Sequence, residues 1–185
     1  MVKKRKWWSL FKNLVSEPDT EWKSIDGSYV KAHQHCAGAT SADSQAIGKS
    51  RAGNTTKIHL AVDSDGLPIE YTVTGGEIHD STAASELIEP LPPAKAVVAD
   101  KGYASEKIRE QISSRGAIAV ILRKSNSVIG NANMDWSLYH HRHLVENAFT
   151  RLKHFSGLAT RYDKLKRNYE SFAAMAYGFL WLPMS

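Results

Sequence analysis

The sequence predicts an α/β protein in which a mixed sheet is flanked by helices. Apolar residues alternate over residues 57–62 and 69–73, and this period of two is typical of strands with one buried face. Residues 94–99 and 117–122 are continuous apolar runs, which indicate strands buried on both faces. Because an amphipathic stretch separates these two runs, strands and helices alternate along the chain, and this alternation is the α/β pattern.

The composition favours one ordinary globular domain. The 185 residues are enough for one domain with a real core and too few for two of ordinary size. The hydrophobic share is 42% and the charged share 23%, which excludes a wholly disordered or collagen-like chain. The net charge of +5 favours a polyanionic partner. The single cysteine, Cys36, cannot form an internal disulfide, so we expect a reducing compartment.

Basic residues gather in two places. Residues 1–15 carry five of them and no acid, and residues 139–167 carry seven against two acids. Composition alone is as compatible with a solvated face as with a nucleic-acid surface, but two basic ends around an acid-containing middle suit a nucleic-acid enzyme. The N-terminus shows no signal-peptide pattern. The longest apolar stretch, residues 172–182, is shorter than the roughly 20 residues that cross a bilayer, so we expect a core helix.

The first elements are a strand, a loop and a hairpin. Residues 37–54 are rich in Gly, Ser, Ala and Thr, and this composition predicts a mobile loop. The strands over residues 57–62 and 69–73 form a hairpin, because turn residues fill positions 63–66 between them. Residues 19–31 contain a strand, one face of which is shared by Asp26, Ser28 and Val30.

The later elements are two helices and the two buried strands. A helix is expected over residues 80–88, capped by Asp80 or Ser81. The first buried run ends at Asp100, so its strand delivers a carboxylate at its C-terminal tip. Residues 105–115 predict an amphipathic helix that begins at a serine N-cap and ends before a glycine.

The helix predicted over residues 136–155 carries the sharpest signal. At about 100° per residue, four polar residues fall within about 60° of one another on one face. These residues are Tyr139, Arg142, Glu146 and Lys153. They border an apolar stripe that is expected to face the core, made of Leu138, Leu144, Val145, Ala148, Phe149, Leu152 and Phe155. Ion pairing at i and i+4 explains Arg142 and Glu146, but it explains neither Tyr139 nor Lys153.

These four residues resemble the Y-R-E-K signature of bacterial insertion-sequence DDE transposases, in which the same residue types have the same spacings. Residues 24–28 resemble the family's first-aspartate segment, and residues 98–103 resemble its second. Residues 75–81 and 159–164 are similar to segments of the insertion-sequence-five group. The resemblance covers about residues 22–182 and follows the family's order.

The resemblance implies an RNase H-like catalytic domain over residues 22–185. Residues 1–21 would then be a basic segment, the remnant of an upstream helical region. Asp26, Asp100 and Glu146 are implied to be the catalytic acids and to hold two Mg²⁺ ions, which Mn²⁺ can replace. Two such ions, roughly 3.5 to 4 Å apart, would activate the attacking oxygen of a phosphodiester reaction and stabilise the leaving oxygen.

The same resemblance implies that Tyr139, Arg142 and Lys153 contact DNA, with Arg142 able to grip a phosphate through two hydrogen bonds. The implied reaction is cleavage at the ends of an insertion sequence, followed by attack of the freed 3′-hydroxyl on target DNA. The implied partners are the terminal inverted repeats and target DNA, further copies of the chain on DNA, and an upstream-frame DNA-binding product, but no membrane. We expect a cytoplasmic, nucleoid-associated bacterial protein.

A second hypothesis is a truncated remnant that binds DNA or regulates a partner without catalysing a reaction. Only 25 residues precede Asp26, where complete relatives generally place a helical DNA-binding region. The presence of all three acids and all four signature residues favours active chemistry over this alternative.

Two other groups of residues contain side chains that can bind ligands. The residue types of His33, His35 and Cys36 suit zinc, but the sequence lacks a second ligand pair at the usual spacing. Aromatic residues near the N-terminus could stack on bases, although we expect them to be partly exposed parts of a larger helical face. These are Trp7, Trp8 and Phe11.

Four further acids compete with the proposed triad. We interpret each of them structurally, as a turn residue, a helix cap or an ion-pair partner. In that order they are Asp63 and Asp65, then Asp80, then Asp163.

Overall fold

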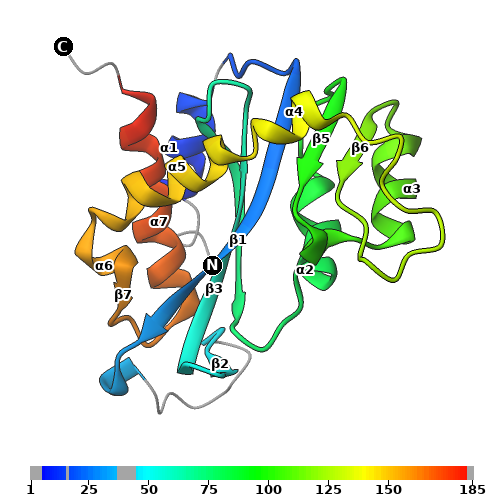
Figure 1. Cartoon of the computed structure of the whole chain (residues 1–185). Helices are drawn as coiled ribbons and strands as arrows, with labels where there is room; N and C mark the ends of the chain where they lie inside the picture. Colours follow the sequence, from blue (N-terminus) through cyan, green and yellow to red (C-terminus); the bar gives the residue numbers. More distant parts are fainter. Residues whose placement is uncertain (1–5, 16, 37–44, 183–185) are drawn as a thin grey trace.

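The computed structural model describes residues 6–15, 17–36 and 45–182, which form one mixed sheet of seven strands with helices on both faces (Figure 1). The strands are β1 (Trp22–Ala32), β2 (Gly48–Ser50), β3 (Gly53–Val62), β4 (Pro68–Gly75), β5 (Ala96–Ala99), β6 (Ile118–Ile121) and β7 (Thr160–Arg161). Their order is β2-β3-β1-β5-β6, with β4 paired to β3 and β7 paired to β1.

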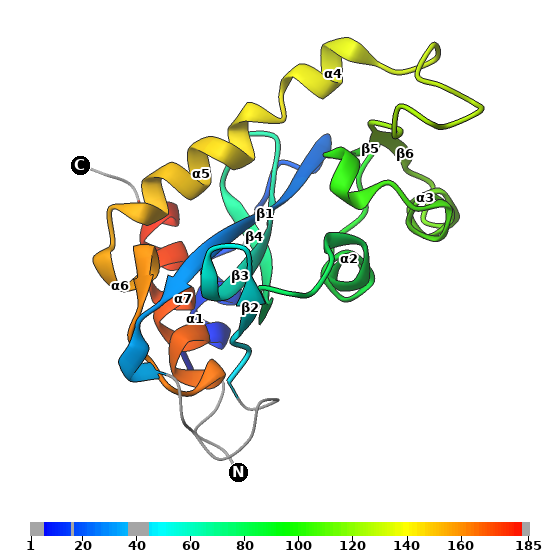
Figure 2. The ribbon, with the colours of Figure 1, turned by 60° about the horizontal axis from the view of Figure 1, so that its bottom comes forward.

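Helices cover the two faces of this sheet with separate apolar cores. The helices are α1 (Lys6–Leu14), α2 (Asp80–Ile88), α3 (Glu106–Ser114), α4 (Trp136–His140), α5 (His143–Lys153), α6 (Ser156–Ala159) and α7 (Lys166–Trp181). Helices α2 and α3 pack on one face, and α1, α5 and α7 pack on the other, as Figure 2 shows. The predicted α/β class, with a mixed sheet flanked by helices, is confirmed.

The antiparallel half of the sheet contains the predicted hairpin. Strand β3 pairs with both β1 and β4, and the turn between β3 and β4 is held by Asp63. The Oδ1 atom of Asp63 accepts hydrogen bonds from the backbone N–H of Asp65 at 3.1 Å and of Leu67 at 2.8 Å. Gly66 supplies the positive φ of 80° that this turn requires. The interpretation of Asp63 as a turn residue is therefore confirmed.

The other half of the sheet is parallel. In register, Ile25 of β1 pairs with Ala99 of β5, which pairs with Ile121 of β6. Every residue of β5 is buried, as predicted. Strand β6 lies at the edge of the sheet and its Ile118 is 67% exposed, so the prediction of burial on both faces is wrong there. Antiparallel strands followed by parallel ones form the mixed sheet that the sequence predicts.

The N-cap of α2 differs from the prediction. The ring Nδ1 of His79 accepts a hydrogen bond from the backbone N–H of Ser81 at 3.2 Å, so His79 is the cap and Asp80 is the first helical residue. An imidazole with a free lone pair can accept this bond as a hydroxyl or carboxylate does. The side chain of Asp80 is thereby available for contacts inside the protein.

The predicted helix over residues 136–155 is interrupted. At the junction of α4 and α5, the backbone N–H of Arg142 bonds to the carbonyl of Tyr139 at 3.1 Å, and that of Leu144 bonds to His141 at 3.0 Å. These i to i−3 bonds tighten the turn. The ring of His141 packs against Trp22, with 4.9 Å between ring centroids. Because α4 and α5 are separate, the single helical wheel does not describe the positions of the four signature residues.

The predicted loop over residues 37–54 is partly a strand. Residues 37–44 lie outside the described residues, but β2 pairs with the start of β3. Arg161, which is completely buried, donates hydrogen bonds to the carbonyls of Gln45 at 2.5 Å and Ala46 at 3.0 Å. This residue, distant in sequence, holds the segment that leads into β2. Arg161 also donates to the backbone carbonyl of Asp163, whereas the sequence predicted an ion pair from the Asp163 carboxylate.

The two terminal helices pack together. Phe11 of α1 is completely buried, and its ring lies 5.9 Å from those of Tyr71 and Tyr177. The expectation that Phe11 is partly exposed is wrong, because α7 supplies a partner surface; Trp7 and Trp8 are 48% and 37% exposed, as expected. The apolar C-terminal stretch is part of the core helix α7, as predicted. None of the helices that the structure describes is long and apolar enough to cross a membrane.

Candidate active site

Asp26 and Asp100 lie side by side on one face of the sheet. Ile25 and Ala99 are paired between β1 and β5, so the residues that follow them occupy neighbouring positions. The side chain of Asp26 is only 19% exposed. Burial raises the pKa of Asp26 to about 6; the backbone N–H of Gly27 and the charge of Arg142 oppose this rise, while Asp100 and Asp80 add to it. The site therefore contains a largely buried carboxylate with two other carboxylates nearby.

Arg142 lies between two of the predicted acids. One guanidinium nitrogen, Nη1, is 3.2 Å from Oδ2 of Asp26, and the other, Nη2, is 2.6 Å from Oε1 of Glu146. Arg142 is the residue just before α5, and Glu146 lies one turn farther along the helix. Both side chains are therefore on the same side of α5, and Arg142 reaches Asp26 of β1. The Glu146 side chain is 50% exposed. A single cation thus neutralises part of the charge of both carboxylates.

The remaining signature residues differ in their positions. Burial raises the pKa of Tyr139, and the carboxylate of Asp100, to which its hydroxyl donates a hydrogen bond, adds to the rise. Lys153 is exposed at the last residue of α5, about 10 Å along the helix axis from Glu146 at 1.5 Å per residue. Tyr139 is therefore in the site, whereas Lys153 lies at its margin.

The structure brings most of the predicted site together. Asp26, Asp100, Tyr139 and Arg142 adjoin one another, and Glu146 joins them through Arg142. Among the described residues, no three side chains of His, Cys, Asp or Glu lie close enough together to hold a metal ion. The guanidinium of Arg142 lies between Asp26 and Glu146 and forms an ion pair with each.

The sequence did not predict a buried polar cluster on the opposite face of the sheet. Its centre is Asp80, whose Oδ1 is 2.7 Å from Nζ of Lys57 and 3.4 Å from Nδ1 of His59. The same His59 nitrogen is 3.2 Å from the hydroxyl of Tyr103, and its Nε2 is 3.0 Å from Oγ1 of Thr74. His59, Lys57 and Tyr103 are all buried. We call these residues, Asp80, Lys57, His59, Tyr103 and Thr74, the Asp80 cluster.

The charges of the Asp80 cluster are strongly coupled. Burial alone would raise the pKa of Asp80, but its hydrogen bonds with His59 and Lys57 and the charge of Lys57 lower the pKa to about 2. The pKa of Tyr103 is well above its ordinary value, first because of burial and then because of the nearby carboxylates of Asp80, Asp26 and Asp100. The cluster therefore holds a carboxylate in its charged form directly behind the two aspartates of the site.

Two glycines allow the Asp80 cluster to approach so closely. A Cβ atom on Gly27 would lie 2.6 Å from Oδ1 of Asp80 and 2.9 Å from Cε of Lys57, and one on Gly102 would lie 2.9 Å from Oδ2 of Asp80. Each glycine is within two residues of a predicted catalytic aspartate. One sequence signal could have indicated the cluster. Lys57 and His59 alternate with apolar residues in a strand, so two polar side chains share one face of β3, and that face is buried.

We expect the substitution Gly27→Ala to destabilise the fold by about 1–3 kcal/mol, the usual cost of overpacking a filled interior. The added methyl group would push Asp80 and Lys57 apart within a space that both fill. Urea unfolding of the variant measures this change. Ser28→Ala, at the next position of β1, is the control and should change the unfolding free energy by less than about 0.5 kcal/mol. Equal stability of Gly27→Ala and the parent would contradict the assigned close contact.

The other sequence candidates have structural roles. Cys36 is completely buried, and its sulfur lies 2.6 Å from the carbonyl oxygen of His33 and 3.1 Å from that of Arg161, so its one S–H is shared between them. The rings of His33 and Tyr162 are stacked, with 4.8 Å between centroids. Cys36 thus contributes to the packing of η1 (Gln34–Cys36) against β7.

Comparisons with known proteins identify a family. The family described as Transposase DDE domain matches residues 19–178. A Brucella ovis protein named as a transposase for insertion sequence element IS6501 is 31% identical over 128 residues, which is 69% of this chain and 98% of that protein. A Burkholderia cepacia protein named as a transposase for insertion sequence element IS402 is 30% identical over 125 residues, which is 62% of this chain and 56% of that protein.

Solved structures show a looser likeness. A piggyBac transposase synaptic complex with hairpin DNA has a TM-score of 0.45 at 15% identity, over 69% of this chain and 28% of that chain. A Mos1 transposase paired-end complex with the left transposon end has a TM-score of 0.38 at 11% identity, over 95% of this chain and 60% of that chain. The chain thus spans less than two thirds of each of these two proteins.

Proposed function

This chain belongs to the transposase DDE-domain family, and on that premise we propose that it cuts DNA at the ends of an insertion sequence and joins the freed 3′-hydroxyl to target DNA. The observation that carries the proposal is that Asp26 and Asp100 both follow the last residue pair between β1 and β5, with Arg142 between Asp26 and Glu146. This arrangement brings the largely buried Asp26, the cation Arg142 and the half-exposed Glu146 together at one place on the surface.

The ligand chemistry of the three acids fits a pair of divalent cations, although the acids would have to move closer together to share them. Asp26, Asp100 and Glu146 offer carboxylate oxygens, the ligand type that Mg²⁺ and Mn²⁺ prefer. The raised pKa of Asp26 reflects first its burial and then the charges of Asp100 and Asp80, and a bound cation would stabilise the charged form of this carboxyl. Arg142 already supplies one positive charge at this place, so it would have to turn away from Asp26 or Glu146. When bound, such ions supply an activated attacking oxygen and a stabilised leaving oxygen.

The side chains around the acids would hold the DNA. Arg142, once released from one carboxylate, can grip a phosphate with two parallel hydrogen bonds. Tyr139, whose hydroxyl points to Asp100, would lie beside the strand that is cut. Lys153 is exposed farther along α5 and would act as a point charge on a more distant phosphate.

The wider assignments follow from the same proposal. The partners would be the terminal inverted repeats, target DNA, other copies of the chain and an upstream-frame product, and the place of action would be the bacterial nucleoid. The division into a basic segment of residues 1–21 and a catalytic domain of residues 22–185 belongs to this proposal too. In the structure, α1 packs on α7, so the described part of the first segment shares the core of the rest.

The proposed function is tested by a nicking assay. The substrate is DNA that carries the ends of the element, incubated with the protein and either Mg²⁺, Mn²⁺ or a chelator. We expect cuts at the 3′ ends of the element with either metal and none with the chelator. DNA binding without any metal-dependent cut would instead establish the non-catalytic remnant.

Metal binding can be measured without DNA. We expect Mn²⁺ to raise the thermal unfolding midpoint, because a ligand that binds only the folded state at one hundred times its Kd stabilises it by about 2.7 kcal/mol. Asp26→Asn, which removes a proposed ligand and keeps the side-chain shape, should lose most of this rise. An equal rise in the variant and the parent would place the ion elsewhere.

A further inference from the structure

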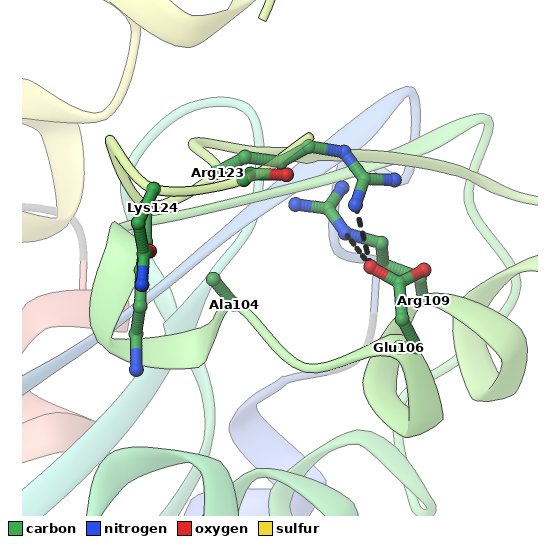
Figure 3. Close-up of a pocket in the computed structure, with 7 residues that line it drawn as sticks. Ala104, Glu106, Arg109, Arg123 and Lys124 are labelled. Carbon is green, nitrogen blue, oxygen red and sulfur yellow. Dashed lines mark hydrogen bonds and ion pairs between the residues drawn. The ribbon is translucent and has the colours of Figure 1, made fainter. Parts of the chain in front are cut away.

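A cavity of about 170 Å³ lies at the carboxyl ends of β5 and β6, between the segments that follow these two strands (Figure 3). Its lining contains three cations, Arg109, Arg123 and Lys124, and one acid, Glu106. The amide of Asn126 and the hydroxyl of Ser127 add two neutral polar groups. Apart from Glu106, the charged and polar side chains of this lining can all donate hydrogen bonds.

The positive charge of this cavity is only partly neutralised. Oε1 of Glu106 lies 2.5 Å from Nη1 of Arg123 and 3.7 Å from Nε of Arg109, so one carboxylate faces two guanidinium groups (Figure 3). Nη2 of Arg109 donates to the carbonyl of Ile121 at 2.8 Å, while its buried Nε has no hydrogen-bond partner among the described residues. Burial lowers the pKa of Arg109, and the charge of Arg123 lowers it further. An additional anion would therefore be stabilised here.

The position of the cavity relates it to Asp100. Ala99 and Ile121 are paired in register, Asp100 follows the first of them, and Arg123 comes two residues after the second. Neighbouring strands lie about 4.8 Å apart and consecutive Cα atoms about 3.8 Å, so the backbone of Arg123 is at most roughly 16 Å from that of Asp100. Successive phosphates of one DNA strand are about 3.4 Å apart along the helix axis. A strand that is cut at Asp26 and Asp100 would pass the cavity within a few nucleotides.

We propose that this cavity binds a backbone phosphate of the DNA strand that is cut, a few nucleotides from the cleaved bond. That the bound anion belongs to DNA rests on the proposed function. That the cavity binds an anion rests on the charges of its lining alone. Arg123 and Lys124 contact the phosphate oxygens, and Glu106 holds both guanidinium groups in place while competing with the phosphate for them. Because the contacts are to the backbone, the site positions DNA without selecting a base sequence.

Two matched pairs of variants test the cavity. Lys124→Gln removes a cation from its lining, and Lys107→Gln removes one from an exposed position of the same region that does not line it. Glu106→Gln removes the competing acid, and Glu110→Gln removes an exposed acid one turn farther along α3. The measurement is fluorescence anisotropy of a short DNA duplex at several salt concentrations, with circular dichroism to verify folding.

We expect Lys124→Gln to weaken DNA binding about fivefold and to reduce the slope of log affinity against log salt by about 1, while Lys107→Gln changes both much less. We expect Glu106→Gln to strengthen binding about threefold, because it removes a negative charge from the phosphate site, and Glu110→Gln to have a smaller effect. Identical behaviour within each pair would overturn the proposal. Since Lys124 and Glu106 are exposed, both variants should fold as the parent does.

The outcome is separable from that of the nicking assay. If the parent never cuts DNA but the pairs differ as expected, the phosphate site stands and the cleavage proposal fails. If the parent cuts DNA and the pairs do not differ, the cavity proposal fails alone. Calorimetry with inorganic phosphate distinguishes the source: binding of free phosphate that depends on Lys124, together with unchanged DNA binding, would overturn the assignment to DNA.

Discussion

The variant Asp100→Asn is expected to lose metal-dependent nicking by about a thousandfold or more, while it remains as stable as the parent. An Asn side chain has the shape of Asp but lacks the charge that a divalent cation requires, so the developing charge of the reaction would lose its main stabilisation. Stability should not fall, because the amide oxygen of the new side chain can still accept a hydrogen bond from Tyr139 and because one of the charges that crowd Asp26 is removed. The measurements are the nicking rate and urea unfolding.

Glu146→Gln extends this prediction to the third acid. Glu146 is 50% exposed, so its replacement should change the unfolding free energy by less than about 0.5 kcal/mol and abolish nicking. Asp65→Asn, at an exposed position of the β3–β4 turn, is the control and should cut DNA at the parent rate. If Glu146→Gln is as active as the parent, a different residue must be the third ligand.

The variant Asp80→Asn is expected to lower the unfolding free energy by about 3 kcal/mol or more at neutral pH. Its partner Lys57 has a side chain that is only 5% exposed, and without Asp80 it would be a buried cation that lacks its counter-ion. Urea unfolding measures the change. Asp65→Asn again serves as the control, since both substitutions remove one carboxylate and only Asp80 is in a buried ion pair.

A second substitution tests whether Asp80→Asn destabilises the fold through the loss of its ion pair with Lys57. Lys57→Met in the Asp80→Asn background removes the unpaired charge and should restore much of the lost stability, because replacing both partners of a buried pair is far less costly than replacing one. If the free-energy changes of the two single variants simply add in the double variant, Asp80 and Lys57 do not interact, and the ion-pair explanation is wrong.

The effect of Asp80 also has a defined pH dependence. The pKa of Asp80 is about 2 in the folded protein against an ordinary 3.8, so its contribution is fully present above about pH 4 and is lost as the pH falls through about 2. The unfolding free energies of the parent and Asp80→Asn should therefore differ by a constant amount between about pH 7 and about pH 5, and should approach each other only in stronger acid. Convergence already at about pH 6 would point to a different titrating group.

The parts of the fold that local patterns determine were predictable from the sequence. Alternation of apolar residues predicted the β3–β4 hairpin, and the end of an apolar run predicted the carboxylate of Asp100 at the tip of β5. The pairing of Asp26 with Asp100 needed the family resemblance, since nothing near either residue indicates that β1 and β5 are neighbours.

The features that the sequence missed depend on contacts between distant residues. The break between α4 and α5 accompanies the packing of His141 on Trp22, and β2 forms in a segment that Arg161 holds from 115 residues away. The Asp80 cluster needs the register that sets His59 opposite Gly27, which no local pattern determines. In each case the local sequence is compatible with the prediction, and tertiary packing decides the outcome.

The parallel seam between β1 and β5 is only four residue pairs long, and both aspartates lie just beyond its end. Local opening of so short a strand pairing would move the two carboxylates apart. Their alignment therefore depends on the side chains that pack over the pairing. Helix α4 covers one face of this pairing, since Leu138 and Tyr139 pack with Trp22 over the small side chains of Ala96 and Val98. Tyr139 therefore also has a structural role: its packing helps to keep β1 and β5 in register and so keeps the two carboxylates together.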